Sequence, residues 1–170
     1  GHRLPLARAL AVASDVCAAL AAAHDSGRVH RDIKPANLLL HADGHATLTD
    51  SPSFGGRARP PKDGPLMVGT ALYMPPEQVV GEDVGPWSDL YSLGCVLYEC
   101  LTGQPPFTNR NEALVLQLHL TQPAPDLRTL RPEVPEALAN TIARALAKRP
   151  EDRWESASAM WDALTPAAVG

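Results

Sequence analysis

Cysteine, basic charge and long apolar runs are all scarce in this chain. Its three cysteines, Cys17, Cys95 and Cys100, show no Cys-x-x-Cys spacing, which excludes the common zinc and redox motifs and is typical of a reducing cytoplasm. The formal net charge is −4, so neither nucleic acid nor a polybasic membrane contact is expected. The most apolar region, 10–23, is interrupted by polar residues and predicts no membrane-spanning segment, and we expect no signal peptide.

What the chain does contain is enough apolar material for one folded domain. Apolar residues make up 45% of the 170 positions, which is sufficient for a core of ordinary size. Apolar residues recur at steps of three and four in several stretches, which is the period of an amphipathic helix. This period predicts helices over 6–24, from about 109 to 120, over 135–149 and over 157–164.

The stretch 89–102 differs from these helices because almost every residue in it is apolar. A helix that is apolar on all sides is buried, so we expect this one to form the central axis of the domain. Asp89 lies in its first turn, where a carboxylate can accept backbone donors, and Gly103 is suited to end it.

The segment 29–50 carries the densest set of polar functional groups. Pro35 prevents a long helix, so this segment is expected to be a structured loop that leads into a hairpin. Residues 38–40 predict a short buried strand, Asp43-Gly44 a tight turn and 46–49 the returning strand. The hairpin would bring Asp50 back beside Asn37, so that two oxygen ligands converge.

Residues 51–69 are rich in Gly, Pro, Arg and Lys and show no periodicity. We expect a long surface loop there, and long loops in small domains are usually functional. The following stretch, 68–78, predicts a turn and a short helix.

Several of these segments resemble the eukaryotic-like serine/threonine protein kinases, especially the bacterial ones. The resemblance is carried by VHRDIKPANLLL, LTD, VGTALYMPPEQ, SDLYSLGCVLYECLTGQPPF and ALAKRPEDRW, in family order and spacing. It implies a mainly α fold, the kinase C-terminal lobe: a helical bundle around a buried central helix, with a small β-hairpin carrying the catalytic and metal-binding segments. Residues 1–165 would form this lobe and 166–170 a tail. The family's glycine-rich loop and strand lysine find no match here, and no Gly-x-Gly-x-x-Gly occurs.

The resemblance implies roles for four residues near the reacting groups. Asp32 resembles the catalytic base that accepts the proton of the substrate hydroxyl. Lys34 resembles the lysine that neutralises the transferring phosphoryl group, and also contacts the nucleotide. Thr70 is similar to the threonine that bonds both of them, and Arg31 would face the activation segment.

The resemblance also implies ATP and Mg²⁺ as cofactors. Asn37 and Asp50 match the two metal ligands, which suits a hard cation that prefers oxygen donors. Leu39 matches the apolar residue beneath the adenine ring. The partner would be a protein substrate with an acceptor Ser or Thr, in the cytoplasm, although a longer parent chain could be membrane-anchored.

Other matches imply structural roles. Glu77 and Arg153 resemble the buried ion pair that anchors the activation segment, and Asp89 the residue that holds the catalytic-loop backbone. His30 matches a packing position. No role is assigned to the remaining histidines, His2, His24, His41, His45 and His119.

The chain departs from the family pattern after Asp50. Ser51-Pro52 stands where the family has Phe-Gly, and no Ser or Thr lies between Phe54 and Gly69. Two interpretations therefore stay open: the catalytic lobe of a serine/threonine kinase that needs its missing N-terminal lobe for activity, or a pseudokinase or truncated scaffold that binds a protein partner without catalysis.

Overall fold

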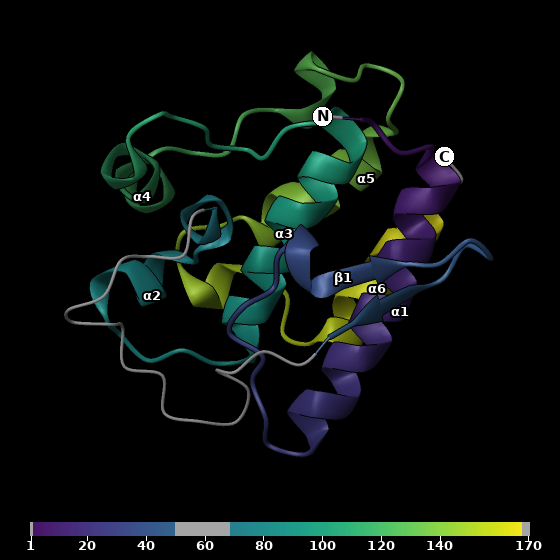
Figure 1. Ribbon diagram of the computed structural model, residues 1–170, viewed down its shortest axis with the longest axis horizontal. Coiled ribbons are helices and arrows are strands. Elements are labelled where there is room, and N and C mark those ends of the chain that lie inside the picture. The colour runs from purple at the N-terminus through teal and green to yellow at the C-terminus, as the bar shows by residue number, and fades with distance from the viewer. Residues whose placement is uncertain (1, 50–68, 168–170) are drawn as a thin grey trace.

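The computed structural model describes residues 2–49 and 69–167. The described chain is mainly helical and contains one small β-hairpin, so the predicted fold class is confirmed (Figure 1). In chain order, the elements are α1 Leu6–Asp25, η1 Pro35–Asn37, β1 Leu38–Leu40, β2 Ala46–Leu48, η2 Thr70–Tyr73, α2 Pro76–Val80, α3 Pro86–Thr102, α4 Glu112–Thr121, η3 Leu127–Thr129, α5 Glu136–Ala145, η4 Pro150–Asp152 and α6 Ala157–Ala167, where η marks a 3₁₀-helix.

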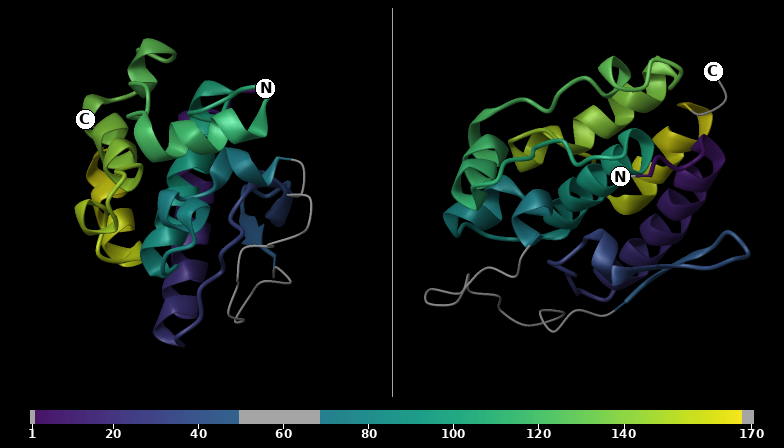
Figure 2. Two further views of the ribbon diagram at one scale, coloured as in Figure 1. Left: turned by 90° about the vertical axis from the view of Figure 1, so that its left-hand side faces the viewer. Right: turned by 45° about the horizontal axis from the view of Figure 1, so that its top comes forward.

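The central axis is α3, as predicted. It runs through the middle of the molecule, with α1 and α6 on one side and α2 and α4 on the other (Figures 1 and 2). All residues from Ser88 to Tyr98 are buried. The helix begins at Pro86, earlier than the apolar run, because proline suits a first turn and the Ser88 hydroxyl accepts the Gly85 N–H at 3.2 Å. It ends at Gly103, also as predicted.

Helix α1 packs against both α3 and α6. The sequence predicted no membrane-spanning segment here, yet within the described residues α1 is the one helix that is long and apolar enough to cross a membrane, by length and composition only. Val12, Val16 and Leu20 are fully buried in the core, which accounts for the apolar composition of the helix.

Besides the start of α3, three predicted helix boundaries are wrong. Helix α6 continues to Ala167 instead of ending at 164. Helix α4 begins at Glu112 instead of about 109, and its cap is Asn111, whose side chain accepts the Ala113 N–H. Helix α5 ends at Ala145, whereas the sequence predicted a helix that continues to 149. The reason is that the carbonyls of residues 147 and 148 bond the Arg153 side chain instead.

The hairpin forms as predicted, with β1 antiparallel to β2 and Leu38 opposite Leu48. Its anchor is Asp15 of α1, which accepts the Ala46 N–H at 2.7 Å. The expectation of a buried first strand is wrong, since Leu39 and Leu40 are 53% and 49% exposed. Helix α1 packs on β2, so it leaves β1 uncovered.

The ion pair implied by the resemblance joins α2 to the segment before α6. Arg153 donates two hydrogen bonds to the Glu77 carboxylate, at 2.8 and 2.9 Å, and both side chains are buried. Burial alone would raise the pKa of Glu77, but hydrogen bonds from Arg153 and Ser88 hold that pKa below its ordinary value. The pair is therefore charged at neutral pH and ties two distant parts of the chain together.

The predicted surface loop lies outside the described residues except for Gly69. This glycine immediately precedes η2 and has φ 89°, a conformation that residues with a Cβ rarely adopt.

Candidate active site

The segment that precedes the hairpin is held in place by one buried carboxylate. Asp89 of α3 accepts the backbone N–H groups of His30 and Arg31, at 2.9 and 2.8 Å. Arg31 has φ 68°, which is unusual for a residue with a side chain and persists only where neighbouring contacts fix it. The role expected for Asp89 is therefore confirmed.

Sequence reasoning missed a third partner of Asp89. His24, at the end of α1, places its Nε2 2.8 Å from Asp89 Oδ2. This contact joins positions 65 residues apart, and no local spacing indicates it. Covariation between the two positions is the kind of signal that could reveal it.

His30 is buried, as expected for a packing position. Its Nε2 lies 2.8 Å from the carbonyl oxygen of Thr49, the last described residue of the hairpin. The imidazole thus joins the start of the catalytic segment to the end of β2, and it fixes both relative to α3 through Asp89.

The three residues assigned to catalysis lie together. Lys34 Nζ is 3.1 Å from Asp32 Oδ1 and donates a hydrogen bond to Thr70 Oγ1 at 3.0 Å. Asp32 and Lys34 come from the segment before η1, whereas Thr70 is the first residue of η2, 36 residues further along. A single ammonium therefore bridges two segments of the chain, and both charged side chains keep some exposure to solvent, 19% and 12%.

Asn37 lies on the other side of Asp32. Its side-chain amide nitrogen donates to the Asp32 carbonyl at 2.7 Å and to Asp32 Oδ2 at 3.0 Å. Because the nitrogen faces Asp32, the amide oxygen faces the opposite way, as a metal ligand would. Thr49 donates its N–H to the Asn37 carbonyl at 2.9 Å. Asp50, the second predicted ligand, lies outside the described residues.

No group of three or more His, Cys, Asp or Glu side chains that could hold a metal occurs within the described residues. For the described part of the chain, this excludes a metal site whose ligands are all His, Cys, Asp or Glu side chains. The donors at Asn37 suit a Mg²⁺ ion that takes much of its coordination from phosphate oxygens and water.

Two further predicted residues have informative surroundings. Arg31 has a buried Nε and a buried Nη1 that bond no group within residues 2–49 and 69–167, and the segment that it was predicted to face begins at Asp50, outside those ranges. Leu39 is exposed on β1, next to η1. Its apolar surface is available to a flat ligand.

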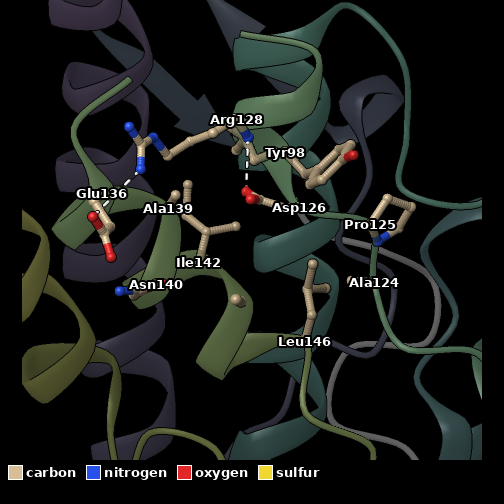
Figure 3. A pocket seen from close by; sticks show the side chains of 12 residues that line it. Tyr98, Ala124, Pro125, Asp126, Arg128, Glu136, Ala139, Asn140, Ile142 and Leu146 are labelled. Carbon is tan, nitrogen blue, oxygen red and sulfur yellow. Dashed lines mark hydrogen bonds and ion pairs between the residues drawn. The ribbon is translucent and has the colours of Figure 1, made fainter. Parts of the chain in front are cut away.

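A cavity of about 250 Å³ lies elsewhere, between α3, η3 and α5 (Figure 3). Its lining is mixed: it includes apolar side chains such as Ile142 and Leu146 and an Arg128–Glu136 ion pair at 3.4 Å. None of the predicted site residues lines it. The candidate active site is therefore the cluster around Asp32, where an ion pair from one segment meets the hydroxyl of Thr70 from another.

Comparison with known proteins finds matches over most of the chain. A family model described as protein kinase domain matches residues 2–163. Serine/threonine-protein kinase PknD of Mycobacterium tuberculosis is 44% identical over 169 residues, covering 94% of this chain and 25% of its own length. PknH of the same species is 40% identical over 154 residues, covering 88% of this chain and 24% of its own length.

Serine/threonine-protein kinase Pkn1 of Myxococcus xanthus is 41% identical over 170 residues, covering 96% of this chain and 24% of its own length. This chain thus spans about a quarter of the length of the curated relatives it matches. Proteins with this domain generally use ATP and Mg²⁺.

Proposed function

Because this chain belongs to the protein kinase family, among the bacterial-type serine/threonine kinases, we propose that it is the catalytic lobe of an enzyme that transfers the γ-phosphoryl group of ATP to Ser or Thr hydroxyls of proteins. The observation that carries the proposal is the bridge that Lys34 forms between Asp32 and Thr70. It supports a site in which the Lys34 ammonium links the proposed base, Asp32, to Thr70 at the start of η2.

Asp32 is the proposed base. The acceptor hydroxyl gives its proton to the Asp32 carboxylate while its oxygen forms the new bond to phosphorus and the bond to the ADP oxygen breaks. The Asn37 amide and the Lys34 ammonium both contact this carboxylate and hold it in one orientation. Such orientation matters because a well-placed base contributes about 10²–10⁴-fold to a rate.

Lys34 is the proposed electrostatic stabiliser. An ammonium has three N–H groups, and two of them serve Asp32 and Thr70. The third can donate to an oxygen of the transferring phosphoryl group. Thr70 positions the ammonium, so it is proposed to act through Lys34.

Asn37 and Asp50 are the proposed ligands of Mg²⁺, which would neutralise charge on the ATP phosphates. The orientation of the Asn37 amide supports its part in this site. Leu39 is proposed to support the adenine ring from below, and its exposure is consistent with a ligand or a second lobe that covers β1.

The chain alone is proposed to be nearly inactive, because holding the reactants in position can lower the barrier by about 7–11 kcal/mol and part of the nucleotide-binding site is missing. As part of a longer polypeptide, it is proposed to act in the cytoplasm. The family's glycine-rich loop and strand lysine, which would complete the nucleotide-binding site, have no match in residues 1–170.

The second candidate is a pseudokinase or scaffold that binds a protein partner without catalysis. Ser51-Pro52 favours it, because serine cannot fill the volume of the family's phenylalanine and proline fixes its own φ. The intact set of Asp32, Lys34, Asn37 and Asp50 favours the enzyme.

A phosphate-transfer assay decides between them. The full-length natural polypeptide that contains this chain is incubated with radiolabelled ATP, Mg²⁺ and a mixture of acceptor proteins. We expect labelled phosphoserine or phosphothreonine, and loss of at least 10²-fold in rate for Asp32→Ala, while Asp83→Ala at an exposed position has no effect. Absent labelling would favour the scaffold, and equal labelling in the two variants would refute the proposed role of Asp32.

A further inference from the structure

A buried histidine lies directly behind η2. His119, in the last turn of α4, is fully buried, and its Nδ1 lies 2.8 Å from the hydroxyl oxygen of Tyr91 on α3. Its ring meets the rings of Phe107 and Tyr91 edge to face, with centroids 4.9 and 5.6 Å apart. These contacts fix the orientation of the imidazole.

The surroundings of His119 determine which of its nitrogens carries the proton. Nδ1 faces the Tyr91 hydroxyl, whereas the backbone carbonyls of Leu72 and Ala71 favour a proton on the other nitrogen, so the hydroxyl donates to Nδ1. A neutral imidazole with an acceptor at Nδ1 carries its proton on Nε2. Burial, and then the Lys148 ammonium, lower the pKa of His119 to about 4 against the opposing effect of nearby carbonyls, so the ring is neutral at pH 7.

The protonated nitrogen faces the backbone of η2. The carbonyl groups of Leu72 and Ala71 lie near enough to favour a proton on the ring. Even so, Nε2 is buried and forms no hydrogen bond with any group in the described part of the chain. A buried donor without an acceptor is rare in folded proteins, and a closer contact with one of these two carbonyls would satisfy this one.

The segment that this nitrogen faces is part of the candidate active site. Thr70, the first residue of η2, accepts the hydrogen bond of Lys34. The far end of η2 is fixed on α3, because Ser92 donates to the Tyr73 carbonyl at 2.7 Å and the Tyr73 hydroxyl donates to Glu99 at 2.5 Å. Its middle packs on α4, where Ala71 forms an apolar cluster with Phe107 and Val115.

We propose that His119 is a positioning residue for the acceptor side of the reaction: its Nε2–H bonds a carbonyl of η2 when an acceptor protein is bound, and this bond sets Thr70 and, through it, Lys34. The proposal rests on the proposed function. It requires a small shift of η2 toward α4, in which a buried donor gains its acceptor.

The kinetic test uses the full-length polypeptide and three variants. His119→Leu keeps an apolar side chain in the space but removes the donor, so we expect kcat/KM for the acceptor protein to fall about tenfold with KM for ATP unchanged. His119→Gln retains an amide donor and should recover most of that loss. Gln117→Leu, at an exposed position of the same helix, is the matched control and should match the unsubstituted protein.

A second measurement does not depend on activity. Amide hydrogen exchange of the same polypeptide, with and without acceptor protein, should show that acceptor protects residues 71–73, and that His119→Leu abolishes this protection while α3 stays unchanged. If His119→Leu loses protection throughout the molecule, His119→Gln carries the test and should keep the protection at 71–73.

Equal kcat/KM in His119→Leu and the unsubstituted protein would overturn the proposal, and so would His119→Gln that performs no better than leucine. An unsubstituted protein that transfers no phosphate would refute the proposed function instead. In that case partner-dependent exchange at 71–73 would still decide whether His119 engages η2.

Discussion

At the scale of single residues, the candidate chemistry depends on a chain of contacts from Asp32 through Lys34 to Thr70. Asp32 and Lys34 attract each other across 3.1 Å, and Thr70 fixes the lysine from a different segment. The Lys34 side chain would otherwise sample many rotamers, so the main effect of the threonine hydroxyl is to hold this side chain in one conformation. The arrangement therefore predicts that removing the Thr70 hydroxyl lowers kcat more than the loss of one small group would suggest.

Replacing Thr70 by valine keeps the shape of the side chain and removes the acceptor. We expect kcat to fall between about tenfold and a hundredfold, since a hydrogen bond to a charged group is worth about 1.5–3 kcal/mol. Thr70→Ser retains the hydroxyl and should stay close to the unsubstituted rate. Steady-state kinetics of the full-length polypeptide measure this, and a valine variant with normal kcat would contradict the bridge.

Asp89 lies outside the Asp32–Lys34–Thr70 cluster but supports the backbone that carries it, so its removal should disturb the site indirectly. In Asp89→Ala the backbone N–H groups of His30 and Arg31 lose their acceptor inside the fold. We expect the free energy of unfolding to fall by about 3 kcal/mol, measured by urea denaturation. The exposed Asp83→Ala serves as the control, and equal urea midpoints for the two variants would refute the assigned role.

The sequence predicted which residues belong to the candidate site far better than it predicted which side chains contact each other. The order of Asp32, Lys34 and Asn37 was readable because their spacing is local. The contacts of His24 with Asp89 and of His119 with Tyr91 span 65 and 28 residues, and a single sequence holds no signal for them. Which nitrogen of an imidazole is bonded is set by the fold as a whole.

At the scale of elements, the end of α5 lies close against α3 at Gly94. A Cβ built there would lie 3.1 Å from both Ala145 Cβ and Leu146 Cδ2. The two helices can pack at this separation only because position 94 has no side chain. Small residues on facing helices therefore set the distance between them.

Gly94→Val should accordingly destabilise the domain. Overpacking of a tight contact costs about 1–3 kcal/mol, which outweighs the better helix propensity of valine over glycine. Urea unfolding measures the loss, and adding Ala145→Gly should recover part of it. Ala18→Val on the exposed side of α1 controls for the added methyl groups, and an equal effect at both positions would contradict the close approach.

Periodicity predicted the long helices well because burial alone determines their pattern. It failed at helix ends, where one side chain decides. Asn109 and Asn111 are both good caps by type, and only Asn111 reaches an N–H of α4. It also failed for β1, whose apolar residues indicate burial although Leu39 and Leu40 face outward.

At the scale of the whole molecule, the Glu77–Arg153 pair closes the fold by joining positions 76 residues apart. All the N–H groups of the guanidinium have acceptors, since Arg153 also bonds the carbonyls of Trp87, Ala147 and Lys148. Removing one partner leaves a buried charge without its counterpart. Arg153→Met should therefore cost about 3–5 kcal/mol.

The same pair predicts how stability depends on pH. The pKa of Glu77 is lowered in the folded state, so its contribution is fully present above the unfolded-state pKa of about 4.3 and is lost as pH falls through the folded value. Urea midpoints between pH 7 and 3 should fall less steeply in Glu77→Gln than in the unsubstituted chain. Parallel curves would show that Glu77 does not titrate in this way.

The central claim is that Asp32, Asn37 and Asp50 surround one Mg²⁺–phosphate site, and a crystal structure of the full-length polypeptide with Mg²⁺ and a non-hydrolysable ATP analogue tests it most directly. The account predicts a metal ion bound by the Asn37 amide oxygen and the Asp50 carboxylate at about 2.0–2.1 Å. It also predicts Asp32 facing the γ-phosphate, with Lys34 still on Thr70. A nucleotide bound elsewhere, or a metal that neither Asn37 nor Asp50 contacts, would contradict it.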